Sequence, residues 1–140
     1  YDTIANAAPE NAIEFFHGYT YSAHPAACAA GIATQKIYQS EGIFERAAAL
    51  EDYFLDAVWS LKDHPLVVDI RGIGLMAGIE VQSDGVAGRR GGDLQKKMFW
   101  NGLHVKWTGD NAIVAPAFIA ERSHIDEIVD KFRKTLDQIA

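Results

Sequence analysis

The most constraining stretch of this 140-residue chain runs from Phe15 to Tyr38 and reads FFHGYTYSAHPAACAAGIATQKIY. Four consecutive hydroxyl side chains follow Gly18, and Pro25 then opens a run of small residues, at the position where a helix best tolerates proline. Hydroxyls and unpaired backbone N–H groups therefore gather ahead of a helix N-terminus, where the helix dipole favours negative charge. This pattern predicts a site for an anion such as phosphate. An ordinary N-cap region, with Ser22 as the cap of a buried helix, is the alternative.

Hydrophobic spacing predicts the elements that follow this stretch. Apolar residues recur at helical spacing over residues 43–61, with Ser40 as a candidate N-cap, and indicate an amphipathic helix that ends before Pro65. Residues 66–71 and 75–81 alternate between apolar and polar or small side chains. Because a glycine-rich turn separates these two runs, they predict a pair of antiparallel strands.

The next part of the chain predicts smaller elements. Residues 83–92 are rich in glycine and indicate a mobile loop, after which Asp93 is a candidate cap for a short helix that Gly102 closes. Residues 103–107 and 112–115 are predicted strands on either side of a four-residue turn.

A final helix completes the predicted fold. Ser123 and Asp126 resemble a capping box, and apolar residues at helical spacing continue to Ile139. The sum is an α+β fold in which helices cover a small antiparallel-rich sheet. We expect residues 1–24 to be a connecting segment that carries the phosphate-contact turn, and residues 25–140 to form the α+β domain.

Composition excludes several classes of function. The net charge of −6 argues against nucleic acid or an anionic membrane as the main partner. No apolar run reaches the roughly 18 residues of a membrane span, so we expect a soluble protein. The single cysteine, Cys28, is expected to be a buried, inert thiol in a reducing cytosol, so the expected location is cytoplasmic. The five histidines show no metal-ligand spacing, and we expect no metal site.

Two arginine-containing segments have structural interpretations. Residues 72–77 formally match G-x-G-x-x-A, but that dinucleotide motif must open a helix, and residues 75–81 alternate as a strand. We therefore interpret Arg71, just before these glycines, as a structural ion-pair residue rather than a substrate group. The glycine-flanked pair Arg89-Arg90 is interpreted as part of a solvated loop.

Three blocks of this sequence resemble one enzyme family. HGYTYSAHPAACAAGIA is similar to the HGxTYSGHPxxxAAxxA segment of class III (fold type I) pyridoxal-phosphate aminotransferases, with Ala23 in place of a glycine. VVDIRGIGLMAGIEV and GLHVKWTGDNAIVAPAFI resemble that family's vRGxGLmxgiE and GLxVRxxGDxxxxxPP blocks. The order of the blocks is the family's order, and they are most similar to the omega-amino acid:pyruvate (beta-alanine:pyruvate) group. The resemblance implies the C-terminal small domain of a longer fold type I enzyme.

The resemblance also implies roles for particular residues. It implies pyridoxal 5'-phosphate as cofactor and a homodimer or tetramer in the whole protein. Thr20 would contact the phosphate bound by a neighbouring subunit, and Tyr21 would offer its backbone N–H. Lys106 stands where the family often has an arginine that holds the substrate carboxylate, so Lys106 is the candidate substrate-binding residue. Its ammonium group is a point charge, whereas the planar guanidinium of arginine binds a carboxylate through two parallel hydrogen bonds. A solvated or structural Lys106 is the alternative.

No catalytic residue is assigned within this chain. In the family that it resembles, the lysine that forms a Schiff base with the cofactor lies N-terminal to the HGxTYS block, and so does the acidic partner of the pyridine nitrogen. We therefore expect the chain alone to be inactive. The whole protein is expected to move an amino group from an amine or omega-amino acid to a keto acid such as pyruvate. A stand-alone, non-catalytic α+β binding or regulatory module, or an aminomutase or decarboxylase of the same fold, are the alternatives.

Overall fold

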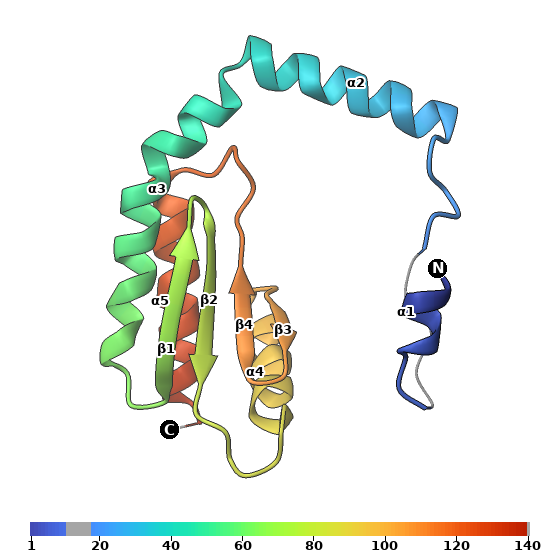
Figure 1. Cartoon of the computed structure of the whole chain (residues 1–140). Coiled ribbons are helices and arrows are strands. Elements are labelled where there is room, and N and C mark those ends of the chain that lie inside the picture. Colours follow the sequence, from blue (N-terminus) through green and yellow to red (C-terminus); the bar gives the residue numbers. More distant parts are fainter. Residues whose placement is uncertain (11–17, 140) are drawn as a thin grey trace. The chain divides into compact units, whose positions relative to one another are not determined.

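The computed structural model describes residues 1–10 and 18–139, and these form two compact units, Tyr1–Ile37 and Tyr38–Ala140. The middle of the expected connecting segment, residues 11–17, lies outside the described residues, and with it the first three residues of the Phe15–Tyr38 stretch. Figure 1 shows the elements of both units.

The first unit consists of helices and an exposed turn. Helix α1 (Asp2–Asn6) forms where the sequence shows no clear period, and helix α2 (Pro25–Ser40) begins at proline as predicted. No residue of α2 is buried, and Cys28 is exposed. The expected burial of this helix and of its thiol is therefore not found within the described residues.

The second unit contains a four-stranded antiparallel sheet. Its strands are β1 (Val67–Ile73), β2 (Met76–Val81), β3 (Lys106–Thr108) and β4 (Asn111–Val114), and their order in the sheet is β1-β2-β4-β3. All three neighbouring pairs are antiparallel. Together with the helices, this sheet confirms the predicted α+β class.

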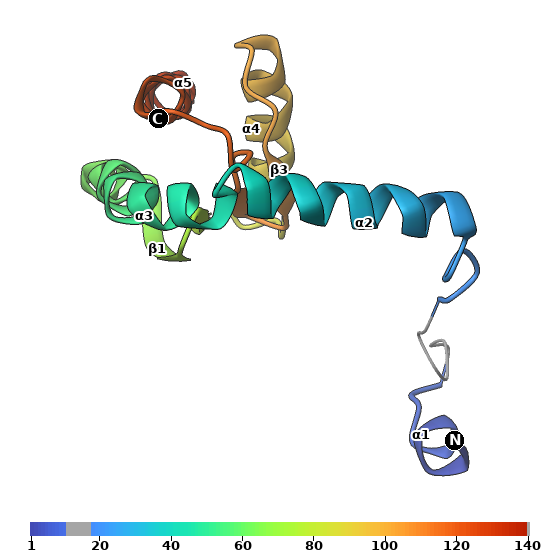
Figure 2. The ribbon, with the colours of Figure 1, turned by 90° about the horizontal axis from the view of Figure 1, so that it is seen from above.

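Three helices cover one face of this sheet. They are α3 (Ile43–Trp59), which continues into the 3-10 turn η1 (Ser60–Asp63), α4 (Arg89–Trp100) and α5 (Arg122–Asp137). Helix α5 contacts both α3 and α4, and Figure 2 shows it nearly end-on. Alternate strand residues bury their side chains against these helices. Large, fully buried side chains come from both layers, among them Phe54, Leu94, Phe132, Ile70 and Ile79.

The beginnings of the helices differ from the predictions. Ser40 is the last residue of α2, and the residue that precedes α3 is Gly42, with φ +60°. Helix α5 is preceded by Glu121, whose backbone N–H donates to Nδ1 of His124 at 3.0 Å, so the predicted Ser123–Asp126 capping box is wrong. In both cases the observed cap lies about two residues from the predicted one, which is the range over which helix ends vary.

The region of residues 83–92 also differs from its predicted loop. Helix α4 begins at Arg89, after Gly88 at φ +73°, instead of near Asp93. Arg89 and Arg90 are therefore helical, and Arg89 pairs with Asp84 at 2.7 Å. The β3 strand is shorter than predicted, because only Lys106–Thr108 pair with β4.

The segment after β4 is fastened to the start of α3. Nη2 of Arg46 donates to the carbonyl oxygens of Ile119 and Ala120 at 3.0 and 3.3 Å. The rings of Phe44 and Phe118 lie 5.9 Å apart beside Tyr38. None of the helices in residues 1–10 and 18–139 is both long enough and apolar enough to cross a membrane.

The Gly72→Ala substitution is expected to destabilise the fold. A Cβ at Gly72 would lie 2.7 Å from Cδ2 of Leu55 on α3 and 2.9 Å from the backbone oxygen of Met76. Since the backbone of the hairpin must move to relieve the second contact, we expect the free energy of unfolding to fall by about 1–3 kcal/mol. Urea denaturation measures this change.

Gly78→Ala is the matched control on the neighbouring strand. A Cβ at Gly78 would have its nearest contacts at 3.4 and 3.5 Å, which is ordinary van der Waals contact. Its effect should stay within about 1 kcal/mol. Equal stability of the two variants would show that β1 does not approach α3 and the hairpin turn as closely as described.

Candidate functional site

The turn before α2 places its polar groups in solvent. Residues 18–24 are exposed, and Thr20–His24 line a hollow of about 220 Å³. The backbone N–H of Ser22 donates to the carbonyl of Tyr19 at 3.2 Å, and that of His24 donates to the carbonyl of Tyr21 at 3.3 Å. Within the described residues, no hydrogen bond uses the Thr20 hydroxyl or the Tyr21 backbone N–H. These two predicted groups therefore lie together and are available to a ligand.

His24, rather than Ser22, occupies the capping position of α2. Its Nδ1 accepts from the backbone N–H of Ala27 at 3.4 Å, and its carbonyl accepts from that of Cys28 at 2.9 Å. Its ring also stacks on that of Tyr21, with 5.7 Å between centroids. The structure thus corrects the assignment of Ser22 as the helix cap.

Ala23 adopts the backbone conformation for which glycine is best suited. Its φ is +61°, and it is the one residue other than glycine with positive φ in the described part of the chain. An L-residue with a side chain pays roughly 1 kcal/mol or more there. The glycine that the family motif has at this position would adopt the same turn without this cost.

The turn has the groups for a phosphate but little charge of its own. A free hydroxyl, a free amide N–H and a helix N-terminus are the donors that phosphate sites use. Residues 18–35 contain no lysine or arginine. A phosphate held here would therefore take most of its positive partners from other residues.

Lys106 lies at the edge of the sheet, far along the sequence from this turn. It is the first residue of the edge strand β3, pairs in register with Ile113 and is exposed. It lines a hollow of about 350 Å³ whose other walls are mostly apolar, among them Ile113 and Pro116. None of the ion pairs in the described residues includes Lys106. Its ammonium group is therefore available to an external carboxylate.

Arg71 lies in the same row of the sheet but is already paired. The register runs from Arg71 to Gly78, Ile113 and Lys106, so these four residues share the face away from the helices. Nη1 of Arg71 lies 3.0 Å from Asp69 and 3.3 Å from Glu80. Hydrogen bonds to Asp69 and then Glu80 raise the pKa of Arg71 above its usual range.

These contacts confirm the interpretation of Arg71 as a structural ion-pair residue. The residues after Gly72–Gly74 form β2. A strand at this place excludes the dinucleotide motif, which requires a helix.

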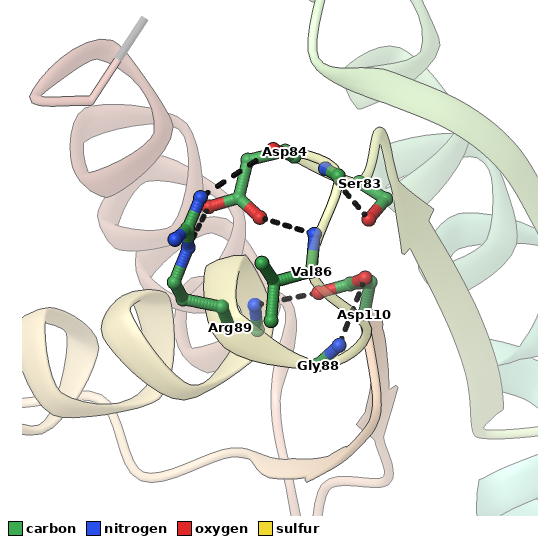
Figure 3. A network of polar contacts seen from close by, with 8 residues as sticks. Ser83, Asp84, Val86, Gly88, Arg89 and Asp110 are labelled. Carbon is green, nitrogen blue, oxygen red and sulfur yellow. Dashed lines mark hydrogen bonds and ion pairs between the residues drawn. The ribbon is translucent and has the colours of Figure 1, made fainter.

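A network of polar contacts joins the β3–β4 turn to the start of α4 (Figure 3). The Asp110 carboxylate accepts hydrogen bonds from the backbone N–H groups of Gly88 at 3.2 Å and Gly91 at 2.9 Å. Asp84 accepts from Nε of Arg89 at 2.7 Å and from the N–H of Val86 at 3.2 Å. The hydrogen bond from Arg89 is the main cause that holds the pKa of Asp84 below its ordinary value.

Asp110 is a residue that the sequence reasoning missed. Its bonds to α4 span 19 and 22 positions, so no local capping pattern indicates them. The signal that could have found it is the Gly109-Asp110 pair, which lies in the third block of the family resemblance.

The described residues offer neither a metal centre nor an activated lysine. Residues 1–10 and 18–139 contain no group of three His, Cys, Asp or Glu side chains that could hold a metal ion. Every lysine of the described chain is exposed or partly exposed, so none lies in the desolvated setting that activates an amine.

Comparison with known proteins identifies the family of this α+β chain. The family model for class-III aminotransferases matches residues 2–136, and the chain belongs to this family. An omega-aminotransferase of Caulobacter vibrioides is 45% identical over 140 residues, which are 99% of this chain and 32% of that protein. A beta-alanine–pyruvate aminotransferase of Pseudomonas aeruginosa is 37% identical over 142 residues, which are 100% of this chain and 32% of that protein.

Solved structures agree with this assignment. The crystal structure of a thermostable omega transaminase 6-fold mutant from Pseudomonas jessenii matches with a TM-score of 0.80 and 29% identity, over 90% of this chain and 30% of that one. The chain thus spans about a third of the length of the relatives it matches. The resemblance to class III aminotransferases is confirmed.

Proposed function

We propose that the whole protein transfers an amino group from an amine or omega-amino acid to a keto acid such as pyruvate. The observation that carries this proposal is the family match over residues 2–136. The names of the relatives, omega-aminotransferase and beta-alanine–pyruvate aminotransferase, support the substrate classes. Residues 25–140 would form the C-terminal small domain of this enzyme, and residues 1–24 would connect it to the rest and carry the turn. The cytoplasmic location stays a prediction.

The cofactor in this proposal is pyridoxal 5'-phosphate, which supplies the electron sink that transamination needs when it is bound. The Thr20 hydroxyl and the Tyr21 backbone N–H would donate to its phosphate. Support comes from their exposure, from the absence of any partner among the described residues, and from their place ahead of the α2 N-terminus.

The proposed contact joins two subunits. In the family that the chain resembles, the phosphate at this turn belongs to the neighbouring subunit's cofactor, so we propose a homodimer or a tetramer. The scarcity of positive charge near the turn is consistent with this arrangement, because the other subunit would supply the remaining partners.

Lys106 is proposed to hold the carboxylate of the substrate. It is exposed and has no ion-pair partner among the described residues, whereas Arg71 in the same row is paired with two carboxylates. The mostly apolar walls of the hollow beside Lys106 would exclude water and strengthen its attraction for a carboxylate. Because an ammonium is a point charge, it would tolerate more carboxylate orientations than a guanidinium would.

An activity assay of the whole protein tests the proposed function. With pyridoxal 5'-phosphate, pyruvate and either beta-alanine or a carboxylate-free amine as donor, we expect alanine to form. The 140-residue chain alone should form none, because no lysine in its described part is buried. Absence of alanine with every donor would overturn the proposal. Migration of the amino group within one carbon skeleton would indicate an aminomutase instead, and release of carbon dioxide a decarboxylase.

Substitution of Thr20 tests the phosphate contact. In the whole protein, Thr20→Ala should weaken cofactor binding by about tenfold or more, because a hydrogen bond to a charged group is lost. Titration of the cofactor-free protein, followed by the cofactor's absorbance, measures the Kd. Thr20→Ser is the matched control, since it keeps the hydroxyl and should bind nearly as tightly as the unchanged protein. Equal affinity of the alanine and serine variants would contradict this role.

Substitution of Lys106 tests the carboxylate contact. In the half-reaction with the amino donor alone, Lys106→Met should raise the KM for beta-alanine by about tenfold and leave that for a carboxylate-free amine nearly unchanged. Lys106→Arg restores a cation and should retain beta-alanine binding. Lys134→Met removes an exposed charge from α5 and is the control for net charge. A parallel loss with both donors would argue against carboxylate recognition by Lys106.

A further inference from the structure

We propose that Gly91 and Asp110 are positioning residues for Lys106, so that the contact between α4 and the β3–β4 turn determines how well a substrate carboxylate is recognised. This inference rests on the proposed function, in which Lys106 binds that carboxylate. Neither residue would touch the substrate. Both act on the short strand that carries Lys106.

The first observation is the close approach of α4 to the turn. A Cβ at Gly91 would lie 2.0 Å from the backbone oxygen of Gly109 and 3.0 Å from Cε3 of Trp107. Gly91 is buried, so no side chain can be turned away into solvent there. Helix α4 therefore packs directly on the backbone of the turn, through a contact that only glycine permits.

The second observation is the fixation of the turn by Asp110. Its carboxylate binds the N–H groups of Gly88, which Figure 3 shows, and of Gly91, and its carbonyl accepts from the N–H of Val81 at 2.9 Å. One residue thus joins the start of α4, the end of β2 and the β3–β4 turn.

The third observation is that β3 has few other contacts to hold it. It consists of three residues at the edge of the sheet and pairs with β4 alone. Its central residue, Trp107, stacks on Phe132 of α5 at 6.1 Å between centroids. Because side chains alternate along a strand, this anchor directs the side chain of Lys106 to the opposite, open face.

These contacts together place the backbone of Lys106. The anchor at Trp107 fixes its direction, and the joint between Gly91, Gly109 and Asp110 fixes the end of the hairpin. Displacement of the joint would move the lysine ammonium relative to a carboxylate while leaving the turn at Thr20 unchanged. Recognition of the carboxylate should then suffer more than the reaction itself.

The test compares Gly91→Ala with Gly92→Ala in the holoenzyme of the whole protein. A Cβ at Gly92 would meet nothing within 4 Å, and both variants add the same methyl group to the same helix. In the amino-donor half-reaction, Gly91→Ala should raise the KM for beta-alanine by about five- to tenfold, with that for 1-phenylethylamine changed by less than about twofold. Gly92→Ala should change neither.

A double-substitution cycle separates positioning from a general structural effect. In a Lys106→Met background, Gly91→Ala should cause no further rise in the KM for beta-alanine, because the group that it displaces is gone. An equal loss with both donors, or the same rise with and without Lys106, would overturn the inference. If Gly91→Ala does not fold, Asp110→Asn replaces it in the same comparisons, since it keeps the side-chain size but has one acceptor oxygen instead of two and therefore loses one of the two hydrogen bonds.

The failures of the two proposals are distinguishable. A whole protein without transaminase activity contradicts the proposed function and, with it, this inference. An active protein in which Gly91→Ala affects both donors alike contradicts the inference alone. Unchanged beta-alanine binding in Lys106→Met removes the role of Lys106 and therefore that of its positioning residues.

Discussion

The burial of a single face of the sheet against α3, α4 and α5 determines which side chains remain available for chemistry. Residues that alternate inward, such as Ile79 and Ala112, are fully buried and supply the apolar contact. Their neighbours in sequence face away from the helices and form the row that contains Arg71 and Lys106. A shift of one residue in register would exchange the two sets. The apolar residues that must stay buried therefore also determine which residues lie on the open face.

The two cations of that row illustrate how surroundings separate residues of similar charge. Asp69 and Glu80 compensate Arg71, and these three residues come from the hairpin β1–β2. No carboxylate of the described chain is placed in the same way beside Lys106. The sheet thus contains one cation used for structure and one left for a partner, and their positions in the sequence alone do not distinguish them.

Much of the fold could be predicted from hydrophobic period, and the remainder depended on distant residues. Helices α3 and α5 and the hairpin β1–β2 follow from spacing and glycine turns. The start of α4 did not, because its amides are satisfied by Asp110, which lies about 20 residues away. Thr20 and Lys106 were identified by resemblance to a family, and the structure adds that both are exposed and without partners among the described residues. Asp110 and Gly91 were missed, since close backbone approach leaves no periodic signal.

The close contact at Gly91, which leaves no room for a Cβ, also limits the rotation of α4 about its own axis. Successive residues of a helix are separated by about 100° of rotation. A turn of the helix by one position toward Arg90 would bring that side chain against the Gly109 carbonyl, where even a methyl group does not fit, whereas a turn in the other direction would bring Gly92 there. The contact therefore restricts α4 to orientations in which a glycine faces the turn, and substitutions elsewhere on the helix surface can alter its polarity without removing this restriction.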